Sequence, residues 1–413
     1  MTTENTNISK TCILYSIIVA FFCSIKTVNV YLTRDIETEG DKSGPMAMMY
    51  VLTAVVLCIV SFMSRSLSLK YMSKRATFLI LTVVLFYIVT LNFIGPPYTS
   101  PIFFGVFTVF SFLIPFIATI DVRLFIKMIM IFSLPAIMVL DKVFAPLKYY
   151  LDYVSMGVSY SFLTPVIASV VYVACFYKQE NLIQKIITIL SFTINLVYAY
   201  NLFSLGSRGP VFAILSVVAF LFFLKHNTEY GGIKYTRLKI ILGIITIVIL
   251  YFTFIPVLTE IQVLLSDYDL SFRFIDKFVN LNQEDDITNG RDIVYDIVLT
   301  DISSSPLWGW GLDQLANQHH DLNYPHNFIL QIIYDGGILF LIFFVVCLYK
   351  DIVTIWKRCT IEEYALFSLL FFSSVPGALF SDDLWKNSSL WVFFGALLSK
   401  TFVNKNNNIT RSP

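Results

Sequence analysis

The chain has 413 residues, of which 57% are hydrophobic and only 14% are charged. Soluble proteins are typically about 45–50% apolar and about 25% charged, so this composition excludes an ordinary soluble enzyme and indicates a membrane protein. The formal net charge of +1 gives no electrostatic reason to expect a nucleic acid partner.

Long apolar runs recur along almost the whole chain. A hydrocarbon core about 30 Å thick needs about 20 mostly apolar residues per helix, and unpaired backbone groups are too costly there for open strands. We therefore expect an all-α integral membrane protein with about 12 transmembrane helices. The spans are expected at residues 12–33, 46–62, 76–94, 102–120, 124–141, 158–177, 184–204, 209–224, 238–256, 327–349, 362–380 and 386–402.

The distribution of Lys and Arg between the predicted loops sets the orientation. With the N-terminus inside, the inner segments hold most of these residues, so both termini are expected in the cytoplasm. The one long polar stretch, residues 257–325, then lies outside and is rich in acidic residues. The predicted organisation is nine transmembrane helices over residues 1–256, this large outer loop with short amphipathic helices, and three further helices with a cytoplasmic tail over residues 326–413.

Two predicted spans are joined by almost no loop at Gly206-Ser207-Arg208-Gly209-Pro210. Proline suits the first turn of a helix, and Ser207 or Gly209 can occupy the cap before it. The free N–H groups of the next helix would then point outward beside the Arg208 guanidinium, a combination that binds phosphate. The alternative is that Arg208 is an interfacial residue that reaches the lipid headgroups.

A second polar site opens the span that follows the outer loop, at Tyr324-Pro325-His326-Asn327. Asn327 is suited to cap this helix, which would place His326 beside a positive helix end and lower its pKa. Because a neutral imidazole can accept a proton from a substrate hydroxyl, His326 is a candidate general base. The alternative is a histidine that only caps or hydrogen-bonds the loop.

Within the outer loop, Gly290 and Arg291 precede a short apolar-periodic stretch, which predicts an amphipathic helix along the membrane surface. A structural ion pair with one of the many carboxylates of this loop would explain Arg291. Further on, Trp308 and Trp310 can stack on sugar rings or anchor the loop at the membrane interface.

An ordered set of motifs lies along one predicted face of the membrane. It consists of Ser207-Arg208-Gly209, Gly290-Arg291, Pro306-Leu307-Trp308-Gly309-Trp310-Gly311, and His326-Asn327-Phe328-Ile329-Leu330-Gln331 followed by Gly336-Gly337. Taken together, these motifs resemble the O-antigen polymerase and O-antigen ligase superfamily of bacterial inner-membrane glycosyltransferases. Each motif alone is weak, whereas the ordered set is fairly specific and covers residues 200–340.

The resemblance implies that the donor is an oligosaccharide carried on undecaprenyl diphosphate and that transfer occurs on the periplasmic side. It associates Arg208 and Arg291 with the diphosphate, and His326 with activation of the acceptor. His326 would take the proton of the acceptor hydroxyl, whose oxygen attacks the anomeric carbon with inversion while the arginines stabilise the departing diphosphate. No cofactor, metal ion or nucleotide sugar is expected; a polysaccharide chain-length regulator and membrane lipids are the further partners.

The acceptor separates two activities within this superfamily. A polymerase elongates another lipid-linked repeat unit, whereas a ligase transfers the polymer to the lipid A-core oligosaccharide. The opening at residues 325–327 and the stretch at residues 379–386 look more like polymerase sequences, so we favour a polymerase. Asp382 and Asp383 would lie outside, where they can bind acceptor hydroxyls or form a solvated turn. The other expected substrate contacts are Ser207, Tyr324, Asn327, Trp308 and Trp310.

Two other classes of membrane protein fit the sequence less well. A lipid-linked oligosaccharide flippase would also have about twelve spans, but transporters usually carry charged residues inside their spans and repeated halves. Here the mid-span charges are few, and the clearest of them, Lys26, can snorkel to the interface. A receptor or adhesin anchor would give no reason for arginine and histidine residues at helix termini.

Overall fold

The computed structural model of the chain describes residues 10–33, 39–64, 72–139, 153–205, 208–226, 233–235, 257–265, 267, 279, 291–320, 322–399 and 403. Most of these residues are helical. The main helices are α1 (Lys10–Leu32), α2 (Glu39–Met63), α3 (Lys74–Val89), α6 (Val122–Phe132), α8 (Tyr153–Cys175), α9 (Leu182–Leu205), α10 (Arg208–Phe223), α13 (Arg291–Ser304), α15 (Phe328–Lys357), α16 (Ile361–Phe380) and α17 (Ser388–Leu398).

Short elements complete the described part of the chain. They are the π-helical turns η2 (Thr90–Ile94) and η3 (Phe104–Phe110), the 3-10 turns η4 (Leu134–Val139) and η5 (Tyr177–Gln179), the short helices α4 (Pro101–Phe103), α5 (Ser111–Ile117) and α14 (Leu315–Gln318), and the strands β1 (Leu224–His226) and β2 (Ile233–Tyr235). The two strands pair antiparallel, with Lys225 opposite Lys234.

In the part of the chain that the structure describes, seven helices are long and apolar enough to cross a membrane: α1, α2, α3 with its π-helical continuation, α8, α9, α15 and α16. Three shorter apolar helical segments are Pro101–Ile117, Gly209–Phe223 and Ser388–Leu398. The prediction of an all-α membrane protein is therefore confirmed, and these ten segments correspond to ten of the expected spans.

The two other expected spans have a different outcome. The span expected at 124–141 is divided, because α6 ends at Phe132 and the chain continues as 3-10 turns from Leu134. Pro135 accounts for this division, since proline has no N–H to donate to the carbonyl four residues earlier and so cannot continue the α-helical hydrogen bonds. The span expected at 238–256 lies outside the described residues.

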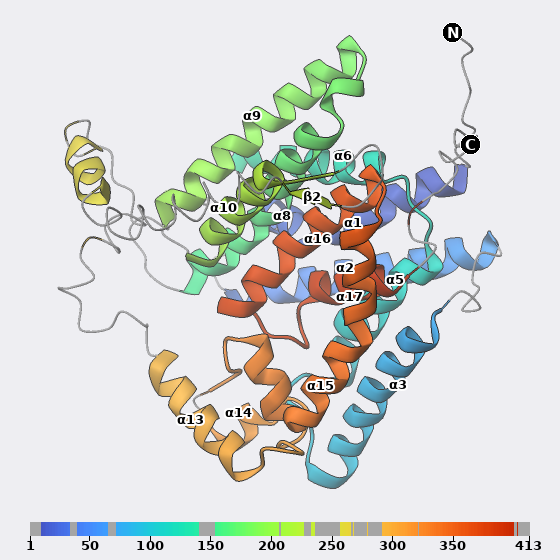
Figure 1. Cartoon of the computed structure of the whole chain (residues 1–413), viewed down its shortest axis with the longest axis vertical. Coiled ribbons are helices and arrows are strands. Elements are labelled where there is room, and N and C mark those ends of the chain that lie inside the picture. Colours follow the sequence, from blue (N-terminus) through green and yellow to red (C-terminus); the bar gives the residue numbers. More distant parts are fainter. Residues whose placement is uncertain are drawn as a thin grey trace.

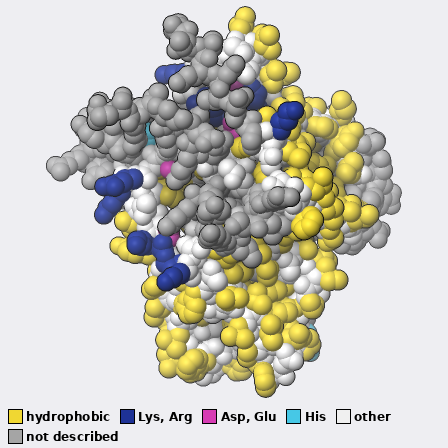
Figure 2. Space-filling model, turned by 90° about the vertical axis from the view of Figure 1, so that its right-hand side faces the viewer, with side chains coloured by type: hydrophobic (Ala, Val, Ile, Leu, Met, Phe, Trp, Pro, Cys, Tyr) yellow, Lys and Arg dark blue, Asp and Glu magenta, His cyan; other side chains and the backbone are white. Residues whose placement is uncertain are grey.

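Burial separates central helices from peripheral ones. In the most apolar window of α16, 67% of the residues are buried inside the protein, whereas in α15 the share is 22%. A helix that is apolar all round and little buried must face lipid, so α2, α3, α9 and α15 supply much of the lipid-facing surface. Figure 2 shows hydrophobic side chains over most of the lower half of one face, with the Lys and Arg side chains higher up.

The helices α13 and α14 lie at the lower end of the molecule, beside α15 and the end of α3 (Figure 1). Both belong to the predicted outer loop. Val294 and Val298 of α13 pack against Leu315 and against Tyr334 of α15 in a small second hydrophobic cluster. This packing fixes the start of α13, and with it Arg291, relative to the bundle.

Candidate functional site

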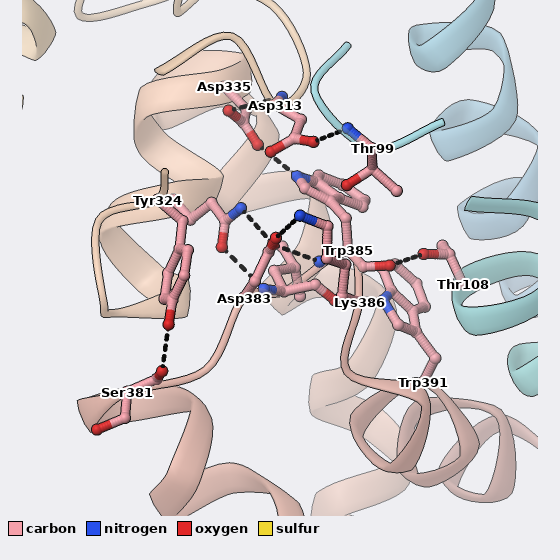
Figure 3. A network of polar contacts seen from close by, with 12 residues as sticks. Thr99, Thr108, Asp313, Tyr324, Asp335, Ser381, Asp383, Trp385, Lys386 and Trp391 are labelled. Carbon is pink, nitrogen blue, oxygen red and sulfur yellow. Dashed lines mark hydrogen bonds and ion pairs between the residues drawn. The ribbon is translucent and has the colours of Figure 1, made fainter. Parts of the chain in front are cut away.

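The turn between α16 and α17 is held rigidly by buried polar contacts (Figure 3). The Asp383 carboxylate accepts hydrogen bonds from Gln331 Nε2 at 2.8 Å and from the Trp385 backbone N–H at 3.0 Å. Gln331 Oε1 in turn accepts from the Leu384 backbone N–H at 2.8 Å. Lys386 Nζ lies 3.3 Å from the second Asp383 oxygen. The amide of Gln331 on α15 therefore fixes the path of this turn.

Two fully buried tryptophans anchor the same turn. The rings of Trp385 and Trp391 stack with centroids 5.7 Å apart. Trp385 Nε1 donates to Asp335 Oδ2 at 2.7 Å, and the Trp385 carbonyl accepts from Thr108 Oγ1 at 2.8 Å. Residues 381 and 382, which directly precede the anchored part, are thereby held in a defined position.

Asp313 is a buried carboxyl group close to this network. Its Oδ2 accepts from the Thr99 backbone N–H at 2.6 Å, and its own N–H donates to Asp335 Oδ1 at 3.1 Å. Burial and the negative charge of Asp383 raise the pKa of Asp313 to about 7, against the opposing effects of Thr99 and Lys386. Asp313 therefore keeps a proton in the folded protein at pH values where an exposed aspartate has lost it.

Stability is expected to depend on pH through Asp313. Above the ordinary aspartate pKa of 3.8 the unfolded chain has lost this proton while the folded protein keeps it. The contribution of Asp313 should therefore lower the free energy of unfolding by about 2–4 kcal/mol as the pH rises from about 4 to about 7. Asp313→Asn keeps the oxygen that accepts from Thr99 and should remove this part of the slope, measured as melting temperature in detergent at several pH values. An unchanged slope would contradict the assignment.

Three side chains of the outer loop converge on Ser381, the first residue after α16. Arg291, the first residue of α13, donates from Nη2 to Ser381 Oγ at 3.1 Å. The Tyr324 hydroxyl donates to the Ser381 carbonyl at 2.8 Å. The ring of His326 lies against that of Tyr324, with centroids 4.4 Å apart. Among the described residues Arg291 forms no ion pair, so the structural pair considered from the sequence is not observed there.

His326 has an unusual backbone and a perturbed imidazole. Its φ of +56° is in the left-handed region that few non-glycine residues adopt. Asn327 caps α15 by accepting from the Ile329 and Leu330 N–H groups at 2.9 and 3.2 Å, as predicted. Burial, and then the Arg291 charge, lower the pKa of His326 to about 4, while the Ser381 backbone and Asp383 raise it. The predicted direction is confirmed, but burial rather than the helix end is the main cause.

The start of α10 approaches the same cluster through Tyr160 of α8. Arg208 is the first residue of α10, and its side chain and Ser207 are outside the described residues. A Cβ built on the next residue, Gly209, would lie 2.1 Å from the Tyr160 hydroxyl oxygen. That hydroxyl interacts with Ser381 and Arg291. Tyr160 and Ser381 thus link the backbone of the predicted phosphate site to the side chains of Arg291 and His326.

Asp382 connects the cluster to the first helix. Its carboxylate lies 3.9 Å from Lys26 Nζ of α1 and accepts from Asn387 Nδ2 at 2.8 Å. The Lys26 and Asp382 side chains are each 29% exposed. Lys26 is therefore paired with a carboxylate at this end of the protein, instead of only extending toward the lipid interface.

The tryptophan motif of the loop crosses α15 where this helix is interrupted. Gly337 has φ +71° and ψ −177° inside α15. The interrupted hydrogen bonds are replaced by loop contacts: Trp310 N–H donates to the Tyr334 carbonyl at 2.8 Å, and Ile338 N–H donates to the Pro306 carbonyl at 2.9 Å. The loop and the helix thus fit together through their backbones. Gly337 is required there because a Cβ on this residue would lie 2.1 Å from the Leu307 carbonyl oxygen.

The two tryptophans of this motif have different surroundings. Trp310 donates its indole N–H to the Asp301 carbonyl of α13 at 2.9 Å and packs on the second hydrophobic cluster. Trp308 is 75% exposed. Trp310 therefore stabilises the loop, and Trp308 is available to a sugar or to the membrane interface.

The site residues predicted from the sequence fall into two groups. Arg291, Tyr324 and His326 meet at Ser381, and Asp382 and Asp383 follow it directly in the chain. Trp308 and Trp310 lie on the loop segment that crosses α15. Asn327 caps α15, and Ser207 and the Arg208 side chain are outside the described residues. Sequence reasoning missed Ser381, Gln331 and Tyr160, which are ordinary polar residues in or beside apolar spans. The described residues contain no group of three or more His, Cys, Asp or Glu side chains that could hold a metal ion.

Comparison with known proteins adds one match. Residues 193–345 match a family model described as O-antigen ligase. No curated protein matches the chain. The matched region runs from α9 into α15 and includes Arg208, Arg291 and His326. This part of the chain is therefore similar to the O-antigen ligase family, in agreement with the O-antigen polymerase and ligase superfamily that the motifs resemble.

Proposed function

We propose that this membrane protein is an O-antigen polymerase, a glycosyltransferase that moves a growing chain from undecaprenyl diphosphate to the hydroxyl of a new lipid-linked repeat unit. The family match supports an activity of the ligase or polymerase type. The observation that carries the proposal is the convergence of Arg291 and His326 on Ser381, next to the N-terminus of α10. A cationic group and a neutral base at one place suit the transfer of a sugar from a diphosphate.

In the proposed reaction His326 is the general base. With its pKa lowered to about 4, the imidazole is neutral near pH 7 and can accept the proton of the acceptor hydroxyl. The acceptor oxygen forms a bond to the anomeric carbon as the bond to the diphosphate oxygen breaks, which inverts the anomeric centre. Arg208 and Arg291 stabilise the charge on the leaving diphosphate, so the mechanism uses no metal ion or other cofactor.

A base with a pKa near 4 is weak, and substrate binding would strengthen it. Arg291 lowers the pKa of His326 through its positive charge. A bound diphosphate would offset that charge, so the pKa of His326 would rise toward its ordinary value of 6.5. General-base catalysis is most efficient when the pKa is near the working pH. Burial, the larger cause of the lowered pKa, would remain, so the base would be stronger with the donor bound than without it.

The remaining assignments of the proposal concern location and substrate contacts. We infer a multi-pass protein of the bacterial inner membrane with both termini in the cytoplasm and the site facing the periplasm. On the face that Figure 2 shows, Lys and Arg side chains are scarce at the lower end, which agrees with this orientation. A chain-length regulator is a proposed partner. The proposed substrate contacts are Ser207, Trp308, Trp310, Tyr324, Asn327, Asp382 and Asp383; of these, the Asp383 carboxylate and the Asn327 side chain already have protein partners.

A ligase is the second candidate, because the matching family model is described as O-antigen ligase. A ligase would use the same donor and the same base, with the lipid A-core oligosaccharide as acceptor.

Deletion of the gene, followed by gel electrophoresis of the surface polysaccharide, separates the two candidates. If the protein is a polymerase, lipopolysaccharide carrying a single repeat unit should remain, and the wild-type gene should restore the ladder of longer chains. Complete loss of O-antigen from lipopolysaccharide, with lipid-linked polymer accumulating, would instead identify a ligase. An unchanged ladder would contradict both.

A further inference from the structure

Tyr160 has a buried hydroxyl group without a suitably placed hydrogen-bond partner among the described residues. The phenol oxygen is inaccessible to solvent and, among the described residues, has no hydrogen-bond partner in suitable geometry. Ser381 lies near enough to interact with it, without forming an aligned hydrogen bond. Burying a hydroxyl group without a hydrogen-bond partner is unfavourable. The buried Tyr160 hydroxyl therefore suggests that a bound ligand supplies the missing acceptor.

Two glycines make room for the Tyr160 ring. A Cβ on Gly209 of α10 would lie 2.1 Å from the hydroxyl oxygen, and a Cβ on Gly377 of α16 would lie 2.8 Å from ring atom Cε1. Any larger residue at either position would displace the ring. The absence of both side chains lets the hydroxyl reach the first turn of α10.

The first turn of α10 is a favourable place for an anion. This helix has 16 residues, and its first N–H groups have no acceptor within the helix. The helix dipole adds partial positive charge at the same end. Arg291 adds a full positive charge close enough to interact with the Tyr160 hydroxyl. A phenol is neutral near pH 7 and can donate one hydrogen bond to a phosphate oxygen.

We propose that the Tyr160 hydroxyl donates a hydrogen bond to a phosphate oxygen of the lipid diphosphate bound at the N-terminus of α10. This assignment rests on the proposed function and adds a residue from α8 to the two arginines. Tyr160 is a binding residue in this arrangement, and it exchanges no proton with the substrate. Its neutral donor complements the arginines because it fixes the orientation of the phosphate without adding charge.

The test compares Tyr160→Phe with the control Tyr198→Phe in purified protein. Tyr198 is fully buried in α9, but its hydroxyl has a protein partner, the Ser133 carbonyl at 2.7 Å. Affinity is measured with undecaprenyl diphosphate in detergent micelles, and melting temperature is measured without ligand. We expect Tyr160→Phe to raise Kd about tenfold, as befits one hydrogen bond to a charged group, and to leave the melting temperature of the free protein unchanged or higher. Tyr198→Phe should lower the melting temperature and leave Kd unchanged.

Each other outcome has a distinct meaning. If Tyr160→Phe binds undecaprenyl diphosphate as tightly as the wild type, the assignment of Tyr160 is wrong while the proposed function stands. If Tyr160→Phe lowers the melting temperature of the free protein without changing Kd, the hydroxyl has a structural role and the assignment is likewise wrong. If the wild-type protein does not bind undecaprenyl diphosphate at all, the proposed donor fails and the inference fails with it.

Discussion

Replacing His326 with alanine is expected to lower the rate of polymer formation by about 10²- to 10⁴-fold, the usual contribution of a positioned general base. The protein should still accumulate in the membrane. His326 precedes α15, and the Asn327 side chain that caps this helix does not depend on the imidazole. Alanine adds some local strain, because the backbone of His326 is in a left-handed conformation, and it removes the contacts of the imidazole with the Tyr324 ring and the Ser381 backbone.

The measurement is polysaccharide length on gels of cells that lack the chromosomal gene and carry the variant. His320→Ala is the matched control, because His320 lies in the same loop with an exposed side chain. This control should give the wild-type ladder. Normal protein abundance together with full-length polysaccharide in the His326→Ala strain would remove His326 from the mechanism.

Replacing Gly337 with alanine is expected to have the largest effect on folding. A φ of +71° with a ψ of −177° is a backbone conformation that only glycine adopts without strain. The new Cβ would also lie 2.1 Å from the Leu307 carbonyl oxygen and 2.5 Å from the Trp308 nitrogen, so the loop segment could not stay in contact with α15. We expect a destabilisation of about 3 kcal/mol or more, enough to remove much of the folded protein.

Folded protein is measured by size-exclusion chromatography and thermal melting in detergent. Gly157→Ala in α8 provides the control, since its Cβ would meet no atom within 4 Å and the residue is helical. That substitution should be neutral or slightly stabilising, because alanine favours helix more than glycine does. Comparable melting temperatures for the two variants would show that the interruption of α15 is not required.

Local sequence patterns predicted much of the fold because their causes are local. Apolar length alone predicts spans, and a capping residue followed by an apolar run predicts a helix start, as Asn327 illustrates. A proline divided the expected span at 124–141, and this division was missed although Pro135 is present in the sequence. The apolar composition of residues 124–141 predicts one continuous span, although the proline within it ends the α-helix.

The candidate site could be predicted only where single residues have distinctive chemistry. Arginine and histidine stand out in an apolar chain, so Arg291 and His326 were selected from the sequence, and the structure brings both to Ser381. Tyr160 is one of 23 tyrosines, and nothing near it in the sequence distinguishes it from tyrosines that only fill the core. Its significance comes from contacts with residues far along the chain, which local patterns do not encode.

The pairing of Lys26 with Asp382 is a similar case. A charged residue within a span signals a partner, because an isolated charge in the membrane is expensive. The sequence offers many carboxylates, and only the folded chain selects Asp382, at 3.9 Å. For the tryptophan motif, the sequence suggested uses of the side chains, whereas the structure adds a fit between the backbones of residues 306–311 and α15.

The interruption of α15 also has a consequence for biogenesis. A bare gap in a helix entering the bilayer would expose carbonyl and N–H groups to lipid. Residues 306–311, which supply the missing partners to Tyr334 and Ile338, precede α15 in the chain and leave the ribosome before it. The hydrogen-bond partners of the interrupted helix are therefore synthesised before the helix itself. A circular permutant that reversed this order would have to insert α15 while these backbone groups have no partner.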